Sequence, residues 1–397
     1  MESSDAVQLL KLAGVIAETD SDLGVEAVQT HLNSLFAQLA TSSVDGEPWQ
    51  VRVDKTGMNS TVFIVTKGSD NLFAVKHATN GYSAAAVVRE QEKLAKIVVK
   101  DQTLSGPRDL LPFPAPLGSL REPHRNLAVS KCLDGINGAE AFKHCKDASD
   151  RLGLVRAFAR AIRQIHDTLA FTTPEYLRIE LHPAEHPQSN RDWLISLLTL
   201  EYTPKTTAKA NRILASESAS ADDKESAQSA LAQLANLQRL ADRPATDSVW
   251  SRRSQLVLTH GDSMIPNMLF ARSVDDGTWE ACGVVDWGDC GYADPRYDVQ
   301  TGLWSIRYNT CVAVMAPELG EWNAWAREKK RIALLIAKAA GPEIEAIKET
   351  KEWKGVVDAC EEAERTYLDA YGMDKEELAE GVFADAYDLF DYYCYDE

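Results

Sequence analysis

Apolar and polar positions alternate with a period of two in the first clearly patterned stretch of the chain. Residues 49–53, 61–66 and 71–77 each alternate, and the turn-forming residues 67–70 separate the last two stretches. Strict alternation is typical of a half-buried strand, and a short run of Gly, Ser and Asp favours a tight turn. The sequence therefore predicts three strands, of which the last two form a hairpin.

Helical periodicity is found on both sides of these strands. Residues 83–100 place Leu94 and Ile97 on one face, and residues 150–169 repeat apolar side chains every three or four positions. Such spacing gives a helix one apolar stripe that packs against a core. Helical spacing is also found within residues 1–48 and predicts one or two helices there.

The remaining stretches mix loops, short strands and helices. Residues 101–126 are rich in proline and predict a loop with an edge strand, and residues 126–133 predict a short apolar strand. Residues 205–241 are rich in Ala, Ser and Gln, so we expect two surface helices there. Three further short strands are predicted in a turn-rich region, at residues 255–259, 267–270 and 282–286.

These elements divide the chain into a β-rich front and a helical back, which predicts an α+β fold with two lobes. We expect a helical extension at residues 1–48, an N-lobe at 49–133 and a C-lobe at 134–397. Residues 205–247 are expected to be a helical insertion in the C-lobe.

Composition narrows the classes of partner and compartment. The net charge of −18 repels nucleic acid and anionic membranes, so neither is expected as a partner. The first residues lack a secretory signal, and no apolar stretch approaches the roughly 20 residues of a membrane span. The 7 cysteines have no Cys-x-x-Cys spacing, which favours reduced thiols and a cytoplasmic location.

The densest cluster of chemically capable residues runs from His260 to Asn267. His260-Gly261-Asp262 lies between two predicted strands, and Asn267 follows five positions after the aspartate. Phosphoryl transfer needs a carboxylate to accept a hydroxyl proton and oxygen ligands for magnesium near the phosphates. Asp262 is therefore the candidate base, and Asn267 is a candidate metal ligand.

A second cluster, Val285-Asp286-Trp287-Gly288, places a carboxylate at the end of an apolar strand. A metal-binding aspartate is expected in this position after the catalytic loop. Asp286 is therefore the second candidate ligand for Mg²⁺.

A third cluster lies in the expected N-lobe. Lys76 stands on an alternating apolar strand, where a charge needs a partner. Glu90 shares a helix face with the apolar side chains, whereas Glu92 lies well around the helix. A Lys–Glu pair that holds ATP phosphates is the kinase arrangement. Backbone N–H groups of a loop would cover the phosphates, at Gly57, Asn59, Ser60 and Thr61.

Taken together, these motifs resemble the aminoglycoside phosphotransferase and choline kinase family, whose members are small-molecule relatives of protein kinases. The resemblance runs from about Gly57 to Tyr371. The motifs that carry it, in the family's order, are Ser130-Lys131-Cys132-Leu133-Asp134-Gly135, Phe158 to His166, His260-Gly261-Asp262 with Asn267, Asp286-Trp287-Gly288 with Asp298, and Thr366 to Tyr371.

The resemblance implies a two-lobed protein-kinase-like fold and an activity that moves the γ-phosphate of ATP or GTP, with Mg²⁺, to a hydroxyl group. It also implies that backbone groups of Ser130 and Cys132 meet the adenine ring. The preferred hypothesis is a resistance-type phosphotransferase for a hydroxylated antibiotic, such as an aminoglycoside. The alternatives are a metabolic kinase for choline, a sugar or an amino-acid derivative, and an inactive nucleotide-binding scaffold. The intact Lys76, Asp262, Asn267 and Asp286 argue against the scaffold.

The C-terminal region is strongly acidic. The resemblance places the C-terminal helices near the acceptor site, so Asp388 and Asp391 are candidates for binding a cationic substrate. The alternative is that these carboxylates form a solvated helix face.

Overall fold

A computed structural model describes the protein at residue 30 and at residues 49–56, 60–68, 70–78, 87, 90, 92–94, 97–99, 116–119, 127–171, 187–251, 256–319 and 351–381. The described parts fall into two compact units. The first unit draws on Met1–Val98, Pro112–Gly135 and Cys282–Gly288, and the second on Val99–Leu111, Ile136–Ala281 and Asp289–Glu397. Of the expected extension at residues 1–48, only the helical Thr30 lies within the described residues.

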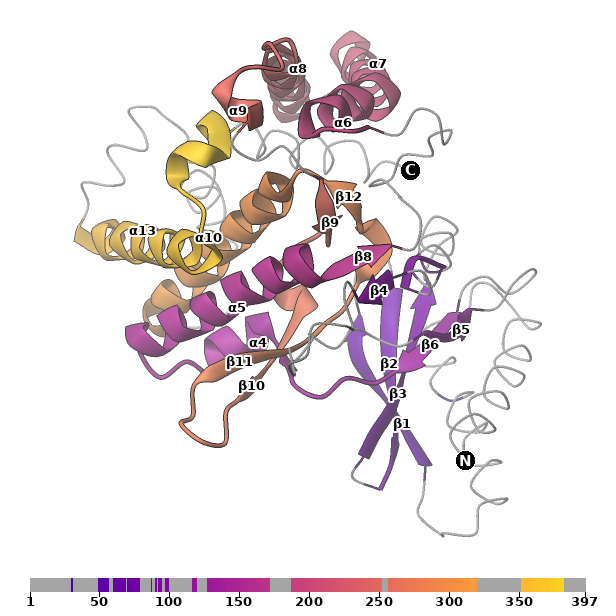
Figure 1. Ribbon diagram of the computed structural model, residues 1–397, viewed down its shortest axis with the longest axis vertical. Coiled ribbons are helices and arrows are strands. Elements are labelled where there is room, and N and C mark those ends of the chain that lie inside the picture. The colour runs from indigo at the N-terminus through magenta and orange to yellow at the C-terminus, as the bar shows by residue number, and fades with distance from the viewer. Residues whose placement is uncertain are drawn as a thin grey trace. The chain divides into compact units, whose positions relative to one another are not determined.

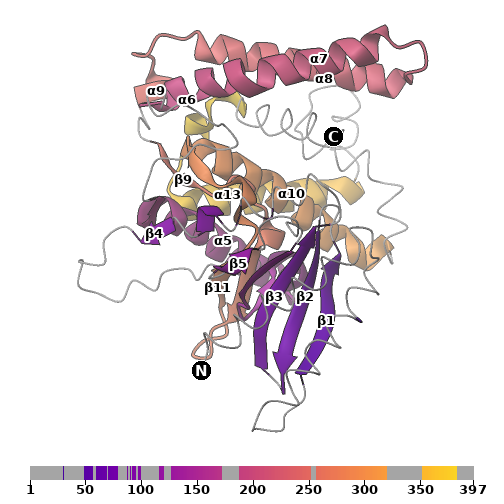
Figure 2. The ribbon, with the colours of Figure 1, turned by 90° about the vertical axis from the view of Figure 1, so that its right-hand side faces the viewer.

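The first unit contains a five-stranded antiparallel sheet in the order β1-β2-β3-β6-β5 (Figure 2). The strands are β1 (Trp49–Thr56), β2 (Ser60–Lys67), β3 (Asp70–Ala78), β5 (Pro116–Ser119) and β6 (Leu127–Lys131). Phe63, Val75 and Val129 pair across its three central strands, and all three are buried. The alternating pattern thus predicted β1 to β3 correctly. Pro116 opens the edge strand β5, where a missing N–H costs no ladder bond.

One boundary prediction in this unit is wrong. The helix expected at residues 83–100 includes the helical residues 87, 90 and 92–94, but Ile97–Val99 form strand β4. Three consecutive β-branched side chains lose rotamer freedom in a helix and fit a pleated strand better. Ile97 therefore does not belong to the helix face on which the periodicity placed it.

The second unit is mainly helical. Its centre consists of α5 (Ala148–Thr168), α10 (Pro295–Leu319) and α13 (Lys351–Tyr371), which pack together (Figure 1). Phe158 on α5 and Tyr367 on α13 are buried, with ring centroids 5.6 Å apart. Gly302 lets α10 approach α13 closely, because a Cβ atom at this position would clash with the Tyr367 hydroxyl. The α+β prediction, with a β-rich front and a mainly helical back, is confirmed.

Shorter elements join these helices. They are β7 (Ile136–Asn137), α4 (Gly138–Lys143), β8 (Leu169–Phe171), β9 (Val257–Thr259), β10 (Met268–Arg272), β11 (Trp279–Val284), the 3-10 turn η4 (Trp287–Asp289), β12 (Gly291–Ala293) and the 3-10 helix η5 (Lys375–Gly381). β9 pairs with β12, and β10 pairs with β7, both antiparallel.

Two predicted strand limits are wrong in this region. Asn267 lies in the 3-10 turn η3 (Ile265–Asn267) rather than at the start of β10, and β11 ends at Val284, so Asp286 lies in a loop. A proline at the second position of η3 starts a helical turn readily, since its fixed φ suits the first residues of a helix.

A long helical hairpin follows residue 187. It runs through α6 (Asn190–Leu197), the π-helical turn η2 (Leu198–Tyr202), α7 (Thr203–Ala215), α8 (Ala221–Ala241) and α9 (Ser248–Ser251). Figure 2 shows α7 and α8 side by side, and the Ser220 capping box starts α8. The two helices predicted at residues 205–241 are confirmed.

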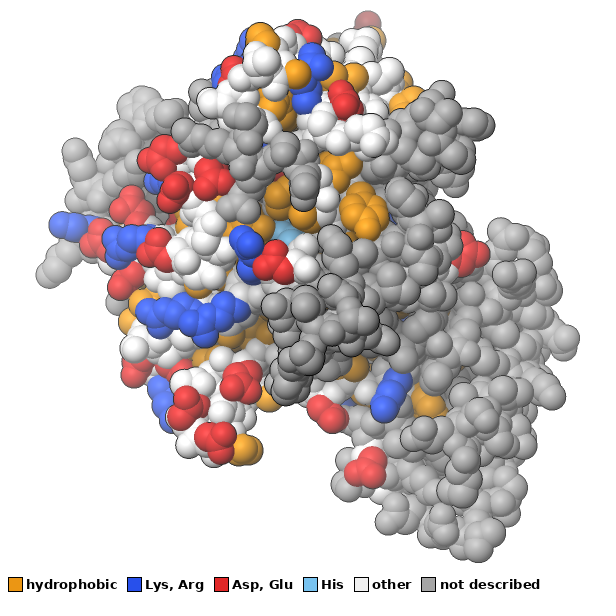
Figure 3. Space-filling model, viewed as in Figure 1, with side chains coloured by type: hydrophobic (Ala, Val, Ile, Leu, Met, Phe, Trp, Pro, Cys, Tyr) orange, Lys and Arg blue, Asp and Glu red, His pale blue; other side chains and the backbone are white. Residues whose placement is uncertain are grey.

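Surface charge around α5 and α13 is of mixed sign. Figure 3 shows basic side chains in a row over α5 and acidic side chains over the neighbouring α13. Arg156 and Arg160 on α5 and Glu361 and Glu362 on α13 are exposed. Interspersed charges of this kind are typical of solvated helix faces. Within the described parts of the chain, no helix is long and apolar enough to cross a bilayer.

Candidate active site

Lys76 is placed by the centre of the five-stranded sheet. β3 has β2 on one side and β6 on the other, so Lys76 faces Val62 and Ala128 in the register. Its Nζ donates to Glu90 Oε2 at 2.8 Å and to Asp286 Oδ1 at 2.6 Å. The sequence predicted the first of these contacts but not the second.

The two carboxylates determine the charge of Lys76. Burial alone would lower the pKa of its ammonium group, but attraction to Asp286 and Glu90 and the hydrogen bonds to both raise that pKa well above its ordinary value. Lys76 therefore stays cationic at every physiological pH. A permanent positive charge of this kind can bind an anion.

Glu90 connects the lysine to the loop after β11. Its side chain is 6% exposed, and while Oε2 binds Lys76, Oε1 accepts a hydrogen bond from the Trp287 backbone N–H at 3.0 Å. Lys93, one turn further along, donates to the Gly288 carbonyl at 3.3 Å. Both oxygens of Glu90 are thus used, and the carboxylate fixes Lys76 and the loop together.

Asp286 has an unusual backbone. Its φ of 66° lies in the left-handed region, which Asp and Asn tolerate better than other residues with a Cβ atom. Trp287 anchors the next position, since it is fully buried and its Nε1 donates to the Val284 carbonyl at 3.0 Å. The side chain of Asp286 remains 44% exposed. One oxygen binds Lys76, and the group is open to solvent and ligands.

In the second unit, the loop after β9 carries Asp262. Asn267 Nδ2 donates to the Asp262 backbone carbonyl at 3.0 Å and to its Oδ2 at 2.9 Å. Gly261 has a φ of 83°, and the Met264 N–H closes a tight turn on the Asp262 carbonyl at 2.7 Å. The structure therefore brings Asp262 and Asn267 together, as their spacing suggests.

Asp298 holds the start of this loop. It is fully buried at the beginning of α10, and it accepts hydrogen bonds from the backbone N–H groups of His260 at 2.6 Å and Gly261 at 2.9 Å. Burial would raise the pKa of this carboxyl group, but the hydrogen bonds from His166 and from the Gly261 backbone lower it below its ordinary value. Asp298 is thus an ionised anchor for the loop and not a group exposed to solvent.

The rest of the loop is fixed by further contacts to the helical core. The Ile265 N–H donates to Ser305 Oγ on α10 at 2.9 Å, and Thr259 Oγ1 donates to the Gly291 carbonyl at 2.9 Å. The backbone on both sides of Asp262 is therefore tied to buried elements. The Asp262 side chain, which this fixed backbone carries, is half-buried.

Asn267 of the second unit and Asp286 of the first each offer an oxygen of the kind that Mg²⁺ binds. Asn267 uses its amide nitrogen, and not its carbonyl oxygen, to bind Asp262. Asp286 offers an ionised and partly exposed carboxylate. Within the described residues, no group of three or more His, Cys, Asp or Glu side chains could hold a metal by itself. Mg²⁺ usually binds one or two carboxylates together with phosphate oxygens and water, so few protein ligands are what this ion requires.

The other candidate residues are located as follows. Ser60 opens β2, and Ser130 lies in β6 beside Ala74 of β3. Cys132 follows β6, with its Sγ donating to the Leu133 carbonyl at 3.7 Å. Four candidates lie outside the described residues, namely Gly57, Asn59, Asp388 and Asp391.

Sequence reasoning gave too small a role to several residues. The sequence favoured a structural cap at Asp298 and a core position near the catalytic loop for His166, but the hydrogen bonds that join these two residues and Tyr371 were not predicted. Lys93 was not singled out at all. A lysine three positions after Glu90 on the same helix face was the available signal.

One family model matches most of the chain. The model of the phosphotransferase enzyme family, APH, matches residues 50–334. Among solved structures, aminoglycoside phosphotransferase APH(3'')-Id from Streptomyces rimosus is 17% identical with a TM-score of 0.45, over 90% of this chain and 97% of that chain. An ethanolamine kinase of Plasmodium vivax is 11% identical with a TM-score of 0.44, over 99% of this chain and 94% of that chain. No curated protein matches. Because the family model spans well over half of the chain, the protein belongs to the APH phosphotransferase enzyme family.

Proposed function

We propose that this protein transfers the γ-phosphate of ATP to a hydroxyl group of a small molecule. The observation that carries the proposal is the double contact of Lys76, which binds both Glu90 and Asp286. An ammonium group held between two carboxylates at a partly exposed position is suited to phosphate oxygens.

In the proposed reaction, Lys76 binds phosphate oxygens of ATP, and Glu90 keeps its ammonium group in place. Asn267 and Asp286 would hold Mg²⁺, which neutralises charge on the phosphates when bound. Backbone groups would make the remaining nucleotide contacts, at Gly57, Asn59, Ser60, Ser130 and Cys132. GTP is the alternative to ATP as the phosphate donor.

Asp262 would accept the proton of the substrate hydroxyl. As that O–H bond breaks, the oxygen forms a bond to the γ-phosphorus, and the bond from that phosphorus to the bridging oxygen of ADP breaks. The hydrogen bond from Asn267 to Asp262 Oδ2 would orient the carboxylate for this step. The products are a phosphate ester and ADP.

The substrate is proposed to be a cationic, hydroxylated antibiotic. The support is the net charge of −18, together with the acidic C-terminal region that includes Asp388 and Asp391. Carboxylates that line an acceptor site favour a cation through charged hydrogen bonds. Choline, a sugar or an amino-acid derivative are the alternative acceptors.

The decisive experiment measures ADP release by the purified protein with Mg²⁺ and ATP. Acceptors are added singly, as aminoglycosides, hygromycin-type antibiotics, choline, ethanolamine, sugars and amino-acid derivatives, and GTP replaces ATP in a parallel series. Stimulation by an aminoglycoside, lost in Asp262→Asn, supports the proposal. Stimulation by choline or ethanolamine alone makes the protein a metabolic kinase.

Two other outcomes overturn parts of the proposal. A preferred acceptor that is neutral or anionic rules out the cationic substrate. If the protein binds ATP but releases no ADP, either with any acceptor or without one, the chain is a nucleotide-binding scaffold. The double variant Asp388→Asn/Asp391→Asn then tests the acidic region separately, since its effect should fall on the KM of the acceptor and diminish at high salt.

A further inference from the structure

A chain of buried hydrogen bonds connects the last residue of α13 with the catalytic loop. Tyr371 Oη lies 2.7 Å from His166 Nδ1, and His166 Nε2 lies 3.1 Å from Asp298 Oδ2. The same oxygen of Asp298 accepts the His260 N–H, and the other oxygen accepts the Gly261 N–H. Three elements that are far apart in sequence thus meet at the residues that precede Asp262.

The geometry determines how the imidazole of His166 is protonated in its neutral form. An ionised Asp298 only accepts hydrogen bonds, so the two side chains bond only in the tautomer that carries the proton on Nε2. Nδ1 then has a lone pair, and the hydroxyl of Tyr371 is the donor that satisfies it. Tyr371 therefore stabilises this tautomer together with Asp298, because without its hydroxyl the Nδ1 lone pair would be buried without a donor.

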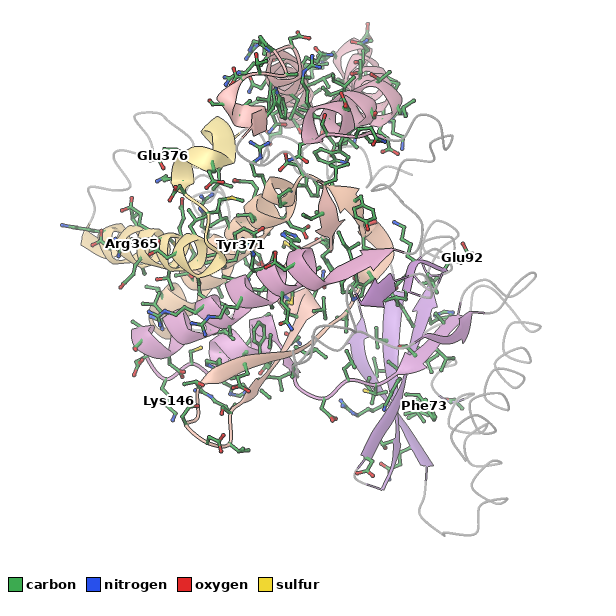
Figure 4. The ribbon with its side chains drawn as sticks, viewed as in Figure 1. Phe73, Glu92, Lys146, Arg365, Tyr371 and Glu376 are labelled. Carbon is green, nitrogen blue, oxygen red and sulfur yellow. The ribbon has the colours of Figure 1, made fainter. Side chains whose placement is uncertain are left out.

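The surroundings keep Tyr371 in place. α13 ends at this residue, and Gly372, with a φ of 80°, closes the helix through its N–H bond to the Leu368 carbonyl at 2.8 Å. The rings of Tyr371 and His166 meet edge to face, and the Arg163 guanidinium lies 5.7 Å from the Tyr371 ring centroid. Figure 4 shows the labelled Tyr371 where α13 faces α5. The hydroxyl is thus delivered by a helix end whose cap sets its position.

We propose that Tyr371 is a positioning residue for the catalytic loop, acting through His166 and Asp298 on the backbone of His260 and Gly261. Its hydroxyl supports the His166 tautomer that donates to Asp298, and this contact holds Asp298 in the orientation that receives both loop N–H groups. The consequence for catalysis rests on the proposed role of Asp262. The effect on the loop itself does not depend on any reaction.

Tyr367 provides a matched control on the same helix. It lies one turn before Tyr371, its ring stacks on that of Tyr371 at 6.5 Å, and it is equally buried. Its hydroxyl has no hydrogen-bond partner among the described residues. Tyr367→Phe therefore makes the same chemical change at the same depth without breaking a hydrogen bond, which should leave the loop unaffected.

The test compares Tyr371→Phe, Tyr367→Phe and the unmodified protein by NMR, with ¹⁵N-labelled histidine for the His166 ring and amide exchange for His260 and Gly261. In the unmodified protein, we expect Nε2 protonated and Nδ1 unprotonated. Tyr371→Phe should mix the tautomers and speed exchange at both amides by about tenfold, the equivalent of one hydrogen bond. Tyr367→Phe should change neither. An unchanged His166 tautomer in Tyr371→Phe, or equal effects of the two variants on amide exchange, overturns the proposal.

Steady-state ADP release with the acceptor found in the screen adds the catalytic readout. Tyr371→Phe should lower kcat by about tenfold with the KM for ATP unchanged, because a displaced loop affects the chemical step and not nucleotide binding. A faster amide exchange with an unchanged kcat would mean that the hydrogen-bond chain orders the loop without positioning Asp262, and this would overturn the catalytic part. If no acceptor yields ADP, the proposed function fails, while the NMR result still decides whether Tyr371 orders the loop.

Discussion

Lys76 and Asp286 are 210 positions apart in the chain, yet the Nζ and Oδ1 atoms lie 2.6 Å apart. Glu90 completes this arrangement with one oxygen on Lys76 and the other on the Trp287 backbone. The lysine therefore binds to the loop twice, directly and through Glu90. Such a network should respond to substitution as a unit rather than as independent contacts.

Lys76→Met and Glu90→Gln should consequently be non-additive. We expect the double variant to differ from the sum of the single variants by about 1 kcal/mol or more in the free energy derived from kcat/KM for ATP. Glu92→Gln is the matched control, since Glu92 is exposed on the same helix. Strict additivity, measured in the same ADP-release assay, would show that the Lys76–Glu90 contact does not contribute to nucleotide use.

Asp286→Asn should raise the magnesium concentration needed for half-maximal activity, because a neutral amide is a poorer ligand for this ion. Asparagine also tolerates the left-handed φ of 66°, so the loop conformation should persist. Titration of activity with MgCl₂ at saturating ATP measures the effect. Superimposable titration curves for the variant and the parent would remove Asp286 from the metal site.

Asp262→Ala should lower kcat by about 10²–10⁴-fold, the usual contribution of a general base, while ATP binding remains. Asp275→Asn, in the exposed loop after β10, is the control for loss of a carboxylate and should have no effect. Single-turnover transfer and equilibrium nucleotide binding separate the two properties. Activity of Asp262→Ala within a few-fold of the parent would exclude this residue as the base.

Asp298→Asn should destabilise the fold by about 3 kcal/mol at pH 7, because it removes a buried charge that several donors stabilise. The pKa of Asp298 is lower in the folded than in the unfolded protein. Its contribution is therefore fully present above the unfolded value of 3.8 and is lost as the pH falls through the folded value. Denaturant unfolding at pH 7 and below pH 4 should show the difference between variant and parent shrinking with acidification. A difference that grows at low pH would contradict the sign of the shift.

Local patterns predicted much of this protein because some features are local. Alternation located β2 and β3, and the spacing from Asp262 to Asn267 located the loop that carries both. The strand at Ile97–Val99 was missed because an apolar run of this length fits a helix face as well as a strand. Periodicity alone does not decide such cases.

The hydrogen bonds of His166 were beyond any local pattern. Its partners Asp298 and Tyr371 are 132 and 205 positions away, and each contact exists only because three helices pack at one point. The second partner of Lys76 was missed for the same reason. Sequence spacing indicates which residues share a loop or a helix face, while contacts between distant elements depend on tertiary packing.

The first unit is built from separate stretches of the chain, and the last of them, Cys282–Gly288, is synthesised long after the others. A ribosome that adds roughly 5–20 residues per second needs about 10–40 seconds to cover the 210 positions from Lys76 to Asp286. During that interval Glu90 is the only one of these two carboxylates that has been made. A nascent chain that stops at residue 135 therefore lacks Asp286, the second partner of Lys76. An N-terminal fragment truncated at this residue would lack that partner permanently.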